Sequence, residues 1–283
     1  MKIKVGFLVS YDYEFLKTSL PLVYKEADTI TLAIDENLNT WSGQKFTIAP
    51  EFFSWFEAID TDKKITFYRD NFYIPELDAK ANDTRERRLL GEKMGEGWNI
   101  QIDADEYFVD FAAFANYLKT NKFIQNKTVQ ICALWITFFK QLEDGILYIK
   151  EPDPFYIGSS NPDYIRCRKN KKQMKVYVPF LVLHQSWART EEDLEKKLKN
   201  WGHNQDFDVD AYIDFWKNLS KDNYHTAKNF HPLGSDNWDS LSYCQGSNMQ
   251  EIMQNLKHNL PKINWTRLFW KNLGERIKYF KFI

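Results

Sequence analysis

The sequence predicts an α/β fold, with a mostly parallel sheet covered by helices on both faces and a helical C-terminal region. Over the first 120 residues, short apolar runs alternate with segments of helical periodicity, which is the pattern of a parallel sheet with crossover helices. Residues 128–184 hold longer apolar runs, typical of mixed or antiparallel strands. From residue 190 onward the helical period prevails.

Length and composition narrow the possible classes of protein. The 283 residues fit one or two domains, and a hydrophobic content of 43% is enough for a sizeable core. A net charge of -1 gives no global basic field that would attract nucleic acid. The three cysteines are far apart in the sequence, so we expect no disulfide framework and no zinc site, and a reducing cytoplasm is the simplest compartment. The N-terminus is a poor signal peptide, and no run approaches the roughly 18 apolar residues of a membrane span.

The first half of the chain alternates four expected strands with four expected helices. The helix that begins at Asp83 is the clearest, because Asp83 and Glu86 have the spacing of a capping box and Gly95 or Gly97 could end it. The expected strands are residues 5–10, 29–35, 64–70 and 98–103, and the expected helices are residues 13–27, 50–59, 83–97 and 110–120.

Acidic residues follow the fourth strand in the stretch WNIQIDADEYF. Ligands of open α/β sheets bind outside the carboxyl ends of the strands, so this position favours a binding site. Asp103 and Asp105 are two residues apart, and in an extended chain both face the same side. Crowded carboxylates repel one another unless a positive charge lies between them.

Several interpretations of this cluster stay open. It could be a solvated acidic turn, a metal-free pair for acid/base catalysis, or a site where carboxylate oxygens bind Mg²⁺ or Mn²⁺ against a substrate phosphate. An EF-hand loop is excluded, because Tyr107 and Phe108 stand where that loop needs Asp or Asn and then Gly.

Four segments of the chain resemble the GT-A-fold glycosyltransferases, near the large group called family two. The resemblance runs from residue 3 to about residue 120, with weaker matches to about residue 205. It implies a GT-A catalytic domain over residues 1–205, with a nucleotide-sugar-binding half (1–120) and an acceptor half (121–205), followed by a helical extension (206–283). The segments are VGFLVSY, SLPLVYKEADTITLAID, TRERRLLGEKMGEGWNIQIDADEYF and LHQSWARTEEDLEKKLKNWGH.

The resemblance also implies roles for particular residues. The DxD aspartates of the family coordinate a divalent metal on the diphosphate of a nucleotide sugar, and Asp103 and Asp105 match them. His184 is the candidate third metal ligand, and Glu191, or alternatively Asp153, is the candidate base of an inverting enzyme. The residues expected to contact the nucleotide sugar are Ser10, Tyr11, Asp35, Arg85, Arg88, Asp103 and Ala104.

The implied function is transfer of a sugar, with Mn²⁺ or Mg²⁺, from a nucleotide sugar to a glycan or lipid-linked saccharide. A UDP-sugar is the favoured donor, and bacterial surface polysaccharide synthesis is the expected setting. A nucleotidyl or phosphoryl transferase is the alternative enzyme, although SYDYEF after the first strand has neither glycine nor a basic residue. A carbohydrate-binding protein on a degenerate GT-A fold is the non-enzymatic alternative, although both DxD acids are present.

The tryptophans and the basic C-terminal segment each have more than one interpretation. Trp41, Trp135, Trp187 and Trp201 could stack on sugars or belong to the core. Residues 262–283 carry six basic residues against Glu275, a net charge of +5, and place apolar residues at helical spacing. This pattern fits either a helix on the anionic inner face of a membrane or a terminal helix packed on the domain.

Overall fold

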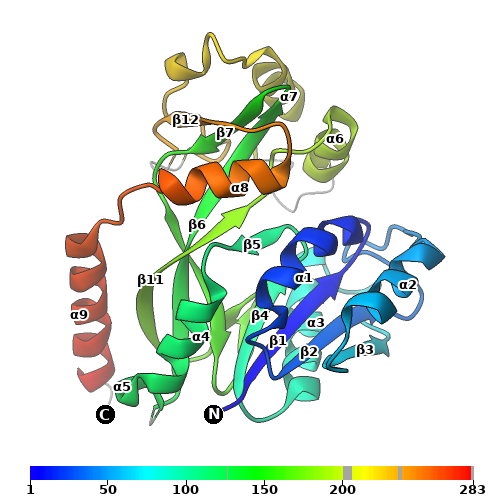
Figure 1. Ribbon diagram of the computed structural model, residues 1–283, viewed down its shortest axis with the longest axis vertical. Helices are drawn as coiled ribbons and strands as arrows, with labels where there is room; N and C mark the ends of the chain where they lie inside the picture. Colours follow the sequence, from blue (N-terminus) through cyan, green and yellow to red (C-terminus); the bar gives the residue numbers. More distant parts are fainter. Residues whose placement is uncertain (126, 200–205, 235–237, 282–283) are drawn as a thin grey trace. The chain divides into compact units, whose positions relative to one another are not determined.

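The computed structural model describes residues 1–125, 127–199, 206–234 and 238–281 (Figure 1). Within these ranges, no helix is both long enough and apolar enough to cross a membrane. The predicted division at residue 205 falls outside the described residues and stays a prediction. The chain forms two compact units: unit 1 comprises Met1–Ala133, Phe155–Phe180 and Trp265–Ile283, and unit 2 comprises Leu134–Pro154 and Leu181–Asn264.

Four parallel strands form the centre of unit 1, in the order β4-β1-β2-β3. The two middle strands, β1 and β2, are mostly apolar and buried, as expected for strands that are covered on both faces, whereas β3 is largely exposed. Part of β8 (Asp153–Ser159) pairs antiparallel with β4 at one edge. The parallel strands are β1 (Ile3–Val9), β2 (Thr29–Asp35), β3 (Ile65–Asp70) and β4 (Trp98–Asp103).

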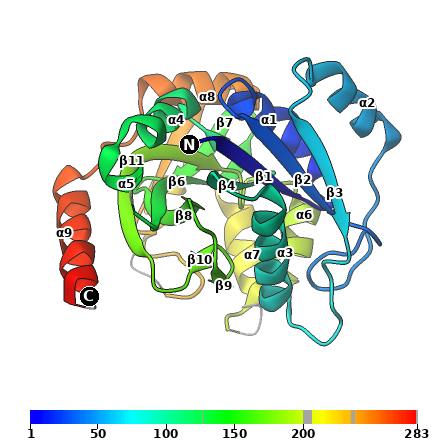
Figure 2. The ribbon, with the colours of Figure 1, turned by 90° about the horizontal axis from the view of Figure 1, so that it is seen from below.

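Helices cover both faces of this sheet, which confirms the predicted fold class. Crossovers between parallel strands are right-handed, so a change in the direction of strand progression moves the next helix to the other face. The chain steps from β1 to β2 to β3 and then returns past them to β4, and α3 lies on the face opposite α1 (Figure 2). The helices of this half are α1 (Leu16–Tyr24), α2 (Pro50–Ile59), α3 (Ala79–Met94), α4 (Phe111–Thr120) and α5 (Lys122–Gln125).

The predicted start of α3 is wrong, because the helix begins at Ala79, four residues before Asp83. The side chain of Asp78 accepts a hydrogen bond from the backbone N–H of Ala81 and so provides the N-cap. Gly95 ends the helix with a φ of 66°, as predicted. Gly6 of β1 lets α3 approach closely, since a Cβ there would lie 2.9 Å from Leu90 Cδ2.

The remaining elements of unit 1 are one short strand directly after β4, the strands between residues 155 and 180, and the C-terminal helix. A short antiparallel pair, β9 with β10, turns back beside α3. These elements are β5 (Glu106–Phe108), β9 (Tyr164–Arg166), β10 (Lys169–Asn170), the first part of β11 (Met174–His184), and α9 (Trp265–Lys281).

Unit 2 is built on antiparallel pairing of β7 with both β6 and β12. The C-terminal region is mostly helical, as predicted, but β12 adds one strand from that region to the edge of β7. The elements are β6 (Val129–Leu142, in part), β7 (Gly145–Ile149), α6 (Glu191–Lys199), α7 (Val209–Asn218), β12 (Leu241–Gln245) and α8 (Met249–His258).

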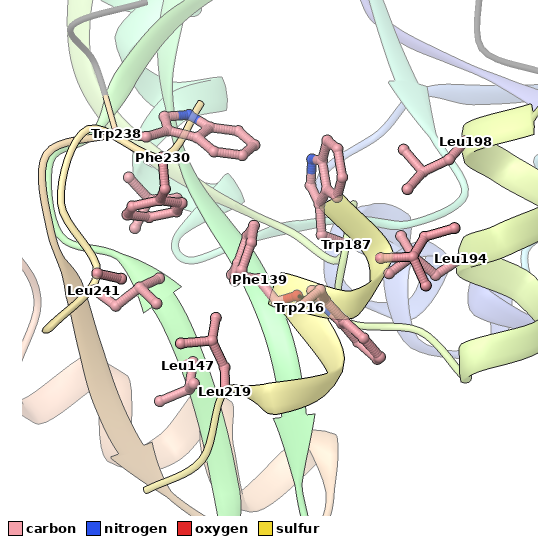
Figure 3. Close-up of a cluster of buried hydrophobic side chains, with 13 residues drawn as sticks. Phe139, Leu147, Trp187, Leu194, Leu198, Trp216, Leu219, Phe230, Trp238 and Leu241 are labelled. Atoms are coloured by element: carbon pink, nitrogen blue, oxygen red, sulfur yellow. Dashed lines mark hydrogen bonds between the residues drawn. The ribbon is translucent and has the colours of Figure 1, made fainter. Parts of the chain in front are cut away.

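An aromatic cluster forms the core of unit 2 (Figure 3). The ring centroid of Phe139 lies 5.9 Å from Trp187, 5.1 Å from Phe230 and 5.7 Å from Trp238. Trp216 donates a hydrogen bond from Nε1 to the carbonyl of Phe139, which satisfies its polar atom inside the core.

The cluster shows which of the four tryptophans that could stack on sugars belongs to the core. Trp187 is 5% exposed and is a core residue. Trp41 belongs to unit 1 and Trp135 to unit 2, and both make specific contacts described below. Trp201 lies outside the described residues.

Replacement of Phe139 by alanine should destabilise the protein by about 3–5 kcal/mol, because the cavity would remove contacts with three buried rings. Urea denaturation followed by circular dichroism measures this loss. Phe207→Ala is the matched control, since Phe207 is only partly buried against the same cluster. Equal losses for the two variants would contradict a core centred on Phe139.

Candidate functional site

Three neighbouring strands of unit 1 bring polar residues to one edge of the sheet. Leu8 pairs with Asp103, and Val9 pairs with Ile34, so Ser10 and Asp35 lie two register positions beyond Asp103 at the same edge of the sheet. The crossovers change direction between β1 and β4, which is the switch point where open α/β sheets bind ligands. The acids at the end of β4 therefore lie where the fold favours a binding crevice.

Two arginines supply positive charge among these acids. Asp103 Oδ1 accepts a hydrogen bond from Arg87 Nη2 at 2.8 Å, and Asp103 Oδ2 lies 2.6 Å from Arg168 Nη2. The same Arg168 nitrogen is 2.9 Å from each carboxylate oxygen of Glu106. Arg87 Nε also pairs with Asp83 at 2.5 Å. We call these five side chains the carboxylate–arginine network.

The network sets different protonation behaviour for its carboxylates. Burial opposes ionisation of Asp103, but the attraction of Arg168 and then of Arg87 holds the pKa of Asp103 well below its usual range. Burial raises the pKa of Glu106 to about 7, against the attraction of Arg168 and helped by the negative charge of Asp103. Asp103 is therefore ionised at any physiological pH, whereas Glu106 changes protonation near neutrality.

Ala104 and Asp105 form the turn between β4 and β5, and the Asp105 side chain is buried. Mg²⁺ sites at substrate phosphates use one or two carboxylates and take further oxygens from the substrate. The expected extended geometry of Asp103 and Asp105 is wrong, because Asp105 lies in the turn after the strand, and binding of a metal by the two acids stays a prediction. Among the described residues, no group of three His, Cys, Asp or Glu side chains is placed to hold a metal by protein ligands alone.

Asp35 ties two loops together at the same edge. Its Oδ1 accepts hydrogen bonds from the backbone N–H groups of Asn37 and Asn39, at 3.1 and 3.0 Å. Its Oδ2 accepts from the N–H groups of Phe72 and Tyr73, at 3.0 and 3.1 Å. The structure thus gives Asp35 a role in shaping the edge, and its expected contact with the nucleotide stays a prediction.

Arg85 and Arg88 lie away from the network that Arg87 forms. Arg85 donates from Nη1 to the carbonyls of Asn71 and Phe72, which anchors the loop after β3. Arg88 is at the surface, and its Nε is 3.8 Å from Glu92. The buried arginine of α3 is Arg87, which the sequence interpretation passed over.

Ser10 and Tyr11 lie in the turn that follows β1. The Ser10 carbonyl accepts from the N–H of Tyr13, and both Ser10 and Tyr11 are half-buried. Their position at the switch point agrees with the expected place of a nucleotide, and the contact itself stays a prediction.

The other predicted site residues belong to unit 2. The ring centroid of His184 lies 4.6 Å from that of Trp135. Glu191, in the first turn of α6, is 2.6 Å from Lys217 Nζ, and Asp153 begins β8. Their roles as metal ligand and base stay predictions.

Arg87 and Arg168 are the two site residues that the sequence did not predict, and the sequence contains a signal for only one of them. Arg87 follows Asp83 by four residues, a spacing that allows a helical ion pair. Arg168 lies between β9 and β10 in the sequence. No local pattern links it to Asp103, which is 65 positions earlier. Only the fold brings Arg168 to the end of β4.

Glu86 is a second buried acid on α3. Trp41 donates to it from Nε1, and the side chain is almost fully buried. Burial raises the pKa of Glu86 to about 8, more than the hydrogen bond from Trp41 lowers it. Glu86 therefore carries a proton at neutral pH.

Replacement of Arg168 by methionine should cost about 3–5 kcal/mol at neutral pH, because it leaves the buried Glu106 without its positive partner and leaves Asp103 with Arg87 alone. The loss should shrink as the pH falls, since a protonated Glu106 no longer needs the guanidinium. Urea denaturation at several pH values measures it. Arg166→Met, at an exposed position two residues earlier, is the control, and a comparably small loss for Arg168→Met would contradict the network.

Glu86→Gln should stabilise the protein increasingly as the pH rises from 5 to 8. The folded wild type keeps a proton with a pKa of about 8, whereas the unfolded chain releases it near 4.5. Wild-type stability therefore falls with rising pH in this window, by up to about 1.4 kcal/mol per pH unit, and glutamine removes that loss. The control is Glu92→Gln, an exposed position on the same helix. The difference in unfolding free energy between this variant and the wild type should not change with pH. A pH-independent effect of Glu86→Gln would show that Glu86 is ionised in the fold.

No protein-family model and no curated protein matches the chain. Among solved structures, mannose-6-phosphate isomerase from Helicobacter pylori matches at 14% identity and a TM-score of 0.31, over 54% of this chain and 57% of that chain. TarS from S. aureus matches at 10% identity and a TM-score of 0.37, over 81% of this chain and 46% of that chain. A UDP-glucose pyrophosphorylase complexed with UDP-glucose matches at 11% identity and a TM-score of 0.30, over 76% and 100%. This chain thus spans less than two thirds of the first two proteins, and all three similarities are distant.

Proposed function

We propose that this chain is a glycosyltransferase that moves a sugar from a UDP-sugar to a saccharide acceptor with the help of Mn²⁺ or Mg²⁺. The observation that carries the proposal is the pair Asp103 and Asp105 at the carboxyl end of β4, beside the end of β1, at the switch point of the sheet. Carboxylates at this place can bind a metal whose other ligands come from a diphosphate.

The loop after β1 favours sugar transfer over nucleotidyl transfer. Residues 10–12 read Ser-Tyr-Asp and lead directly into a short 3-10 helix, Tyr13–Phe15. A phosphate-cradling loop needs glycines for close backbone approach and a basic side chain for charge, and this loop has neither. A half-buried aromatic side chain, Tyr11, suits a nucleobase better than a triphosphate.

The carboxylate–arginine network would position the acids before any substrate arrives. Arg87 and Arg168 hold the two oxygens of Asp103, so its carboxylate is ionised and oriented in advance. Such preorganisation avoids a reorganisation cost during the reaction. A bound divalent ion would supply positive charge for the departing diphosphate.

The transfer step itself forms one bond and breaks another. The acceptor hydroxyl oxygen bonds to the anomeric carbon, and the bond from that carbon to the diphosphate oxygen breaks with its electron pair leaving on the diphosphate. In an inverting enzyme, a carboxylate takes the hydroxyl proton. Glu191 and Asp153 are the candidates from sequence for that base, and His184 is the candidate for a further metal ligand. A glycan or lipid-linked saccharide of a bacterial surface polysaccharide is the acceptor that the family resemblance favours.

Asp105→Asn should weaken UDP binding in the presence of Mn²⁺ by at least about tenfold, because loss of a metal-site carboxylate weakens the metal–diphosphate complex. Isothermal titration with UDP measures this, with and without EDTA. In EDTA the variant and the wild type should bind equally weakly. Asp62→Asn, an exposed acid before β3, is the control and should titrate like wild type.

Two further results would count against the proposal. The first is UDP-sugar turnover that is undiminished in excess EDTA. The second is a thermal-shift panel of UDP-, GDP-, CMP- and dTDP-sugars with Mn²⁺ in which no nucleotide sugar stabilises the protein.

A further inference from the structure

The C-terminal helix α9 is attached to unit 1 by one of its faces (Figure 1). The side chain of Asn272 exchanges two hydrogen bonds with the backbone of Tyr177 on β11, accepting from its N–H and donating to its carbonyl, each at 2.9 Å. Leu268, one turn earlier, is buried. Arg276 lies over the ring of Phe123, 4.7 Å from its centroid. The helix is thus fixed in place on the unit.

A second face of α9 exposes large apolar side chains to solvent. Trp265 is 65% exposed, Phe269 60%, Trp270 63% and Ile277 50%. These four are the most strongly clustered of the exposed large hydrophobic residues in the described ranges, because the others are scattered over several elements. Spacings of one and seven residues place Phe269, Trp270 and Ile277 on one broad side of the helix, and Trp265 lies in its first turn, in line with Asn272. An apolar surface of this kind marks an interaction site.

Basic residues occupy the third face of the same helix. Arg267 and Lys278 are exposed and lie eleven positions apart, three helical turns along one side. Lys271 lies between them, with its ammonium 5.0 Å from the centroid of the Tyr177 ring. Residues 262–283 carry a net charge of +5 in a chain of net charge -1, so the remaining residues carry -6.

We propose that α9 binds the surface of an anionic lipid bilayer, with its apolar face inserted at the level of the headgroups. Tryptophan and phenylalanine on one side and arginine and lysine on the neighbouring side are the composition of a helix that lies in a membrane interface. Each cation near an anionic surface adds to the attraction. The attachment of α9 to unit 1 would then hold the whole chain at the surface.

Charge argues against a second copy of the chain as the occupant of this face. A symmetric pair would place α9 against α9, and two segments of +5 would then meet. An anionic lipid surface complements the same charge. This inference does not depend on the proposed function, because it rests only on the surface of α9.

The test is co-sedimentation of the full chain with vesicles. The wild type should pellet with equal parts phosphatidylcholine and phosphatidylglycerol at low salt, should be released by high salt, and should stay in solution with phosphatidylcholine alone. Phe269→Ser with Trp270→Ser should weaken binding to the anionic vesicles by at least about tenfold, and so should Arg267→Glu with Lys278→Glu. All four positions are exposed, so circular dichroism should show intact folds.

Matched controls come from exposed residues elsewhere on unit 1. Ile165→Ser removes another exposed apolar side chain, and Lys25→Glu with Lys119→Glu reverses two exposed charges. Both should bind anionic vesicles like wild type. The proposal is overturned if the α9 variants bind as the controls do, or if the wild type ignores anionic vesicles. It is also overturned if sedimentation shows a wild-type dimer that Phe269→Ser with Trp270→Ser converts to a monomer.

Discussion

The need to neutralise the half-buried Asp103 at the end of β4 and the buried Glu106 just after it constrains the rest of unit 1. Asp103 and Glu106 lie three residues apart, and each is paired with the same nitrogen of Arg168. Buried ion pairs persist only where their hydrogen bonds compensate for lost hydration, so the position of each partner is narrowly defined. Arg87 therefore fixes how α3 lies on β4, and Arg168 fixes the β9–β10 pair beside α3.

The face that α3 buries has two chemically different halves. Its N-terminal half buries polar side chains, including Asn82, Asp83, Glu86 and Arg87, whereas its C-terminal half buries Leu90 and Met94 against β1. Apolar contacts give this packing its affinity, because they are not directional. The polar half gives it a single register, because a shift along the helix axis would separate charges from their partners.

The parallel sheet could be predicted from sequence because its signals are local. Apolar runs between turn residues mark β1 to β4, and the acids that follow β4 are visible in WNIQIDADEYF. The start of α3 was misplaced, since Asp83 has capping spacing but pairs with Arg87 inside the helix, while Asp78 makes the cap. Arg168 could not be assigned to the site, because tertiary structure alone brings it to Asp103. The family resemblance implied contacts of Arg85 and Arg88 with the nucleotide sugar, which stay predictions, whereas burial and charge place Arg87 in the carboxylate–arginine network.

The two oxygens of Asp35 have a consequence for motion at the sheet edge. One oxygen binds the loop after β2, and the other binds the loop after β3. Neither loop can open without breaking hydrogen bonds to the carboxylate that also holds its neighbour. A rotation of this one carboxylate would therefore release four backbone N–H groups in two loops at once, so the Asp35 side chain sets the closed positions of both loops.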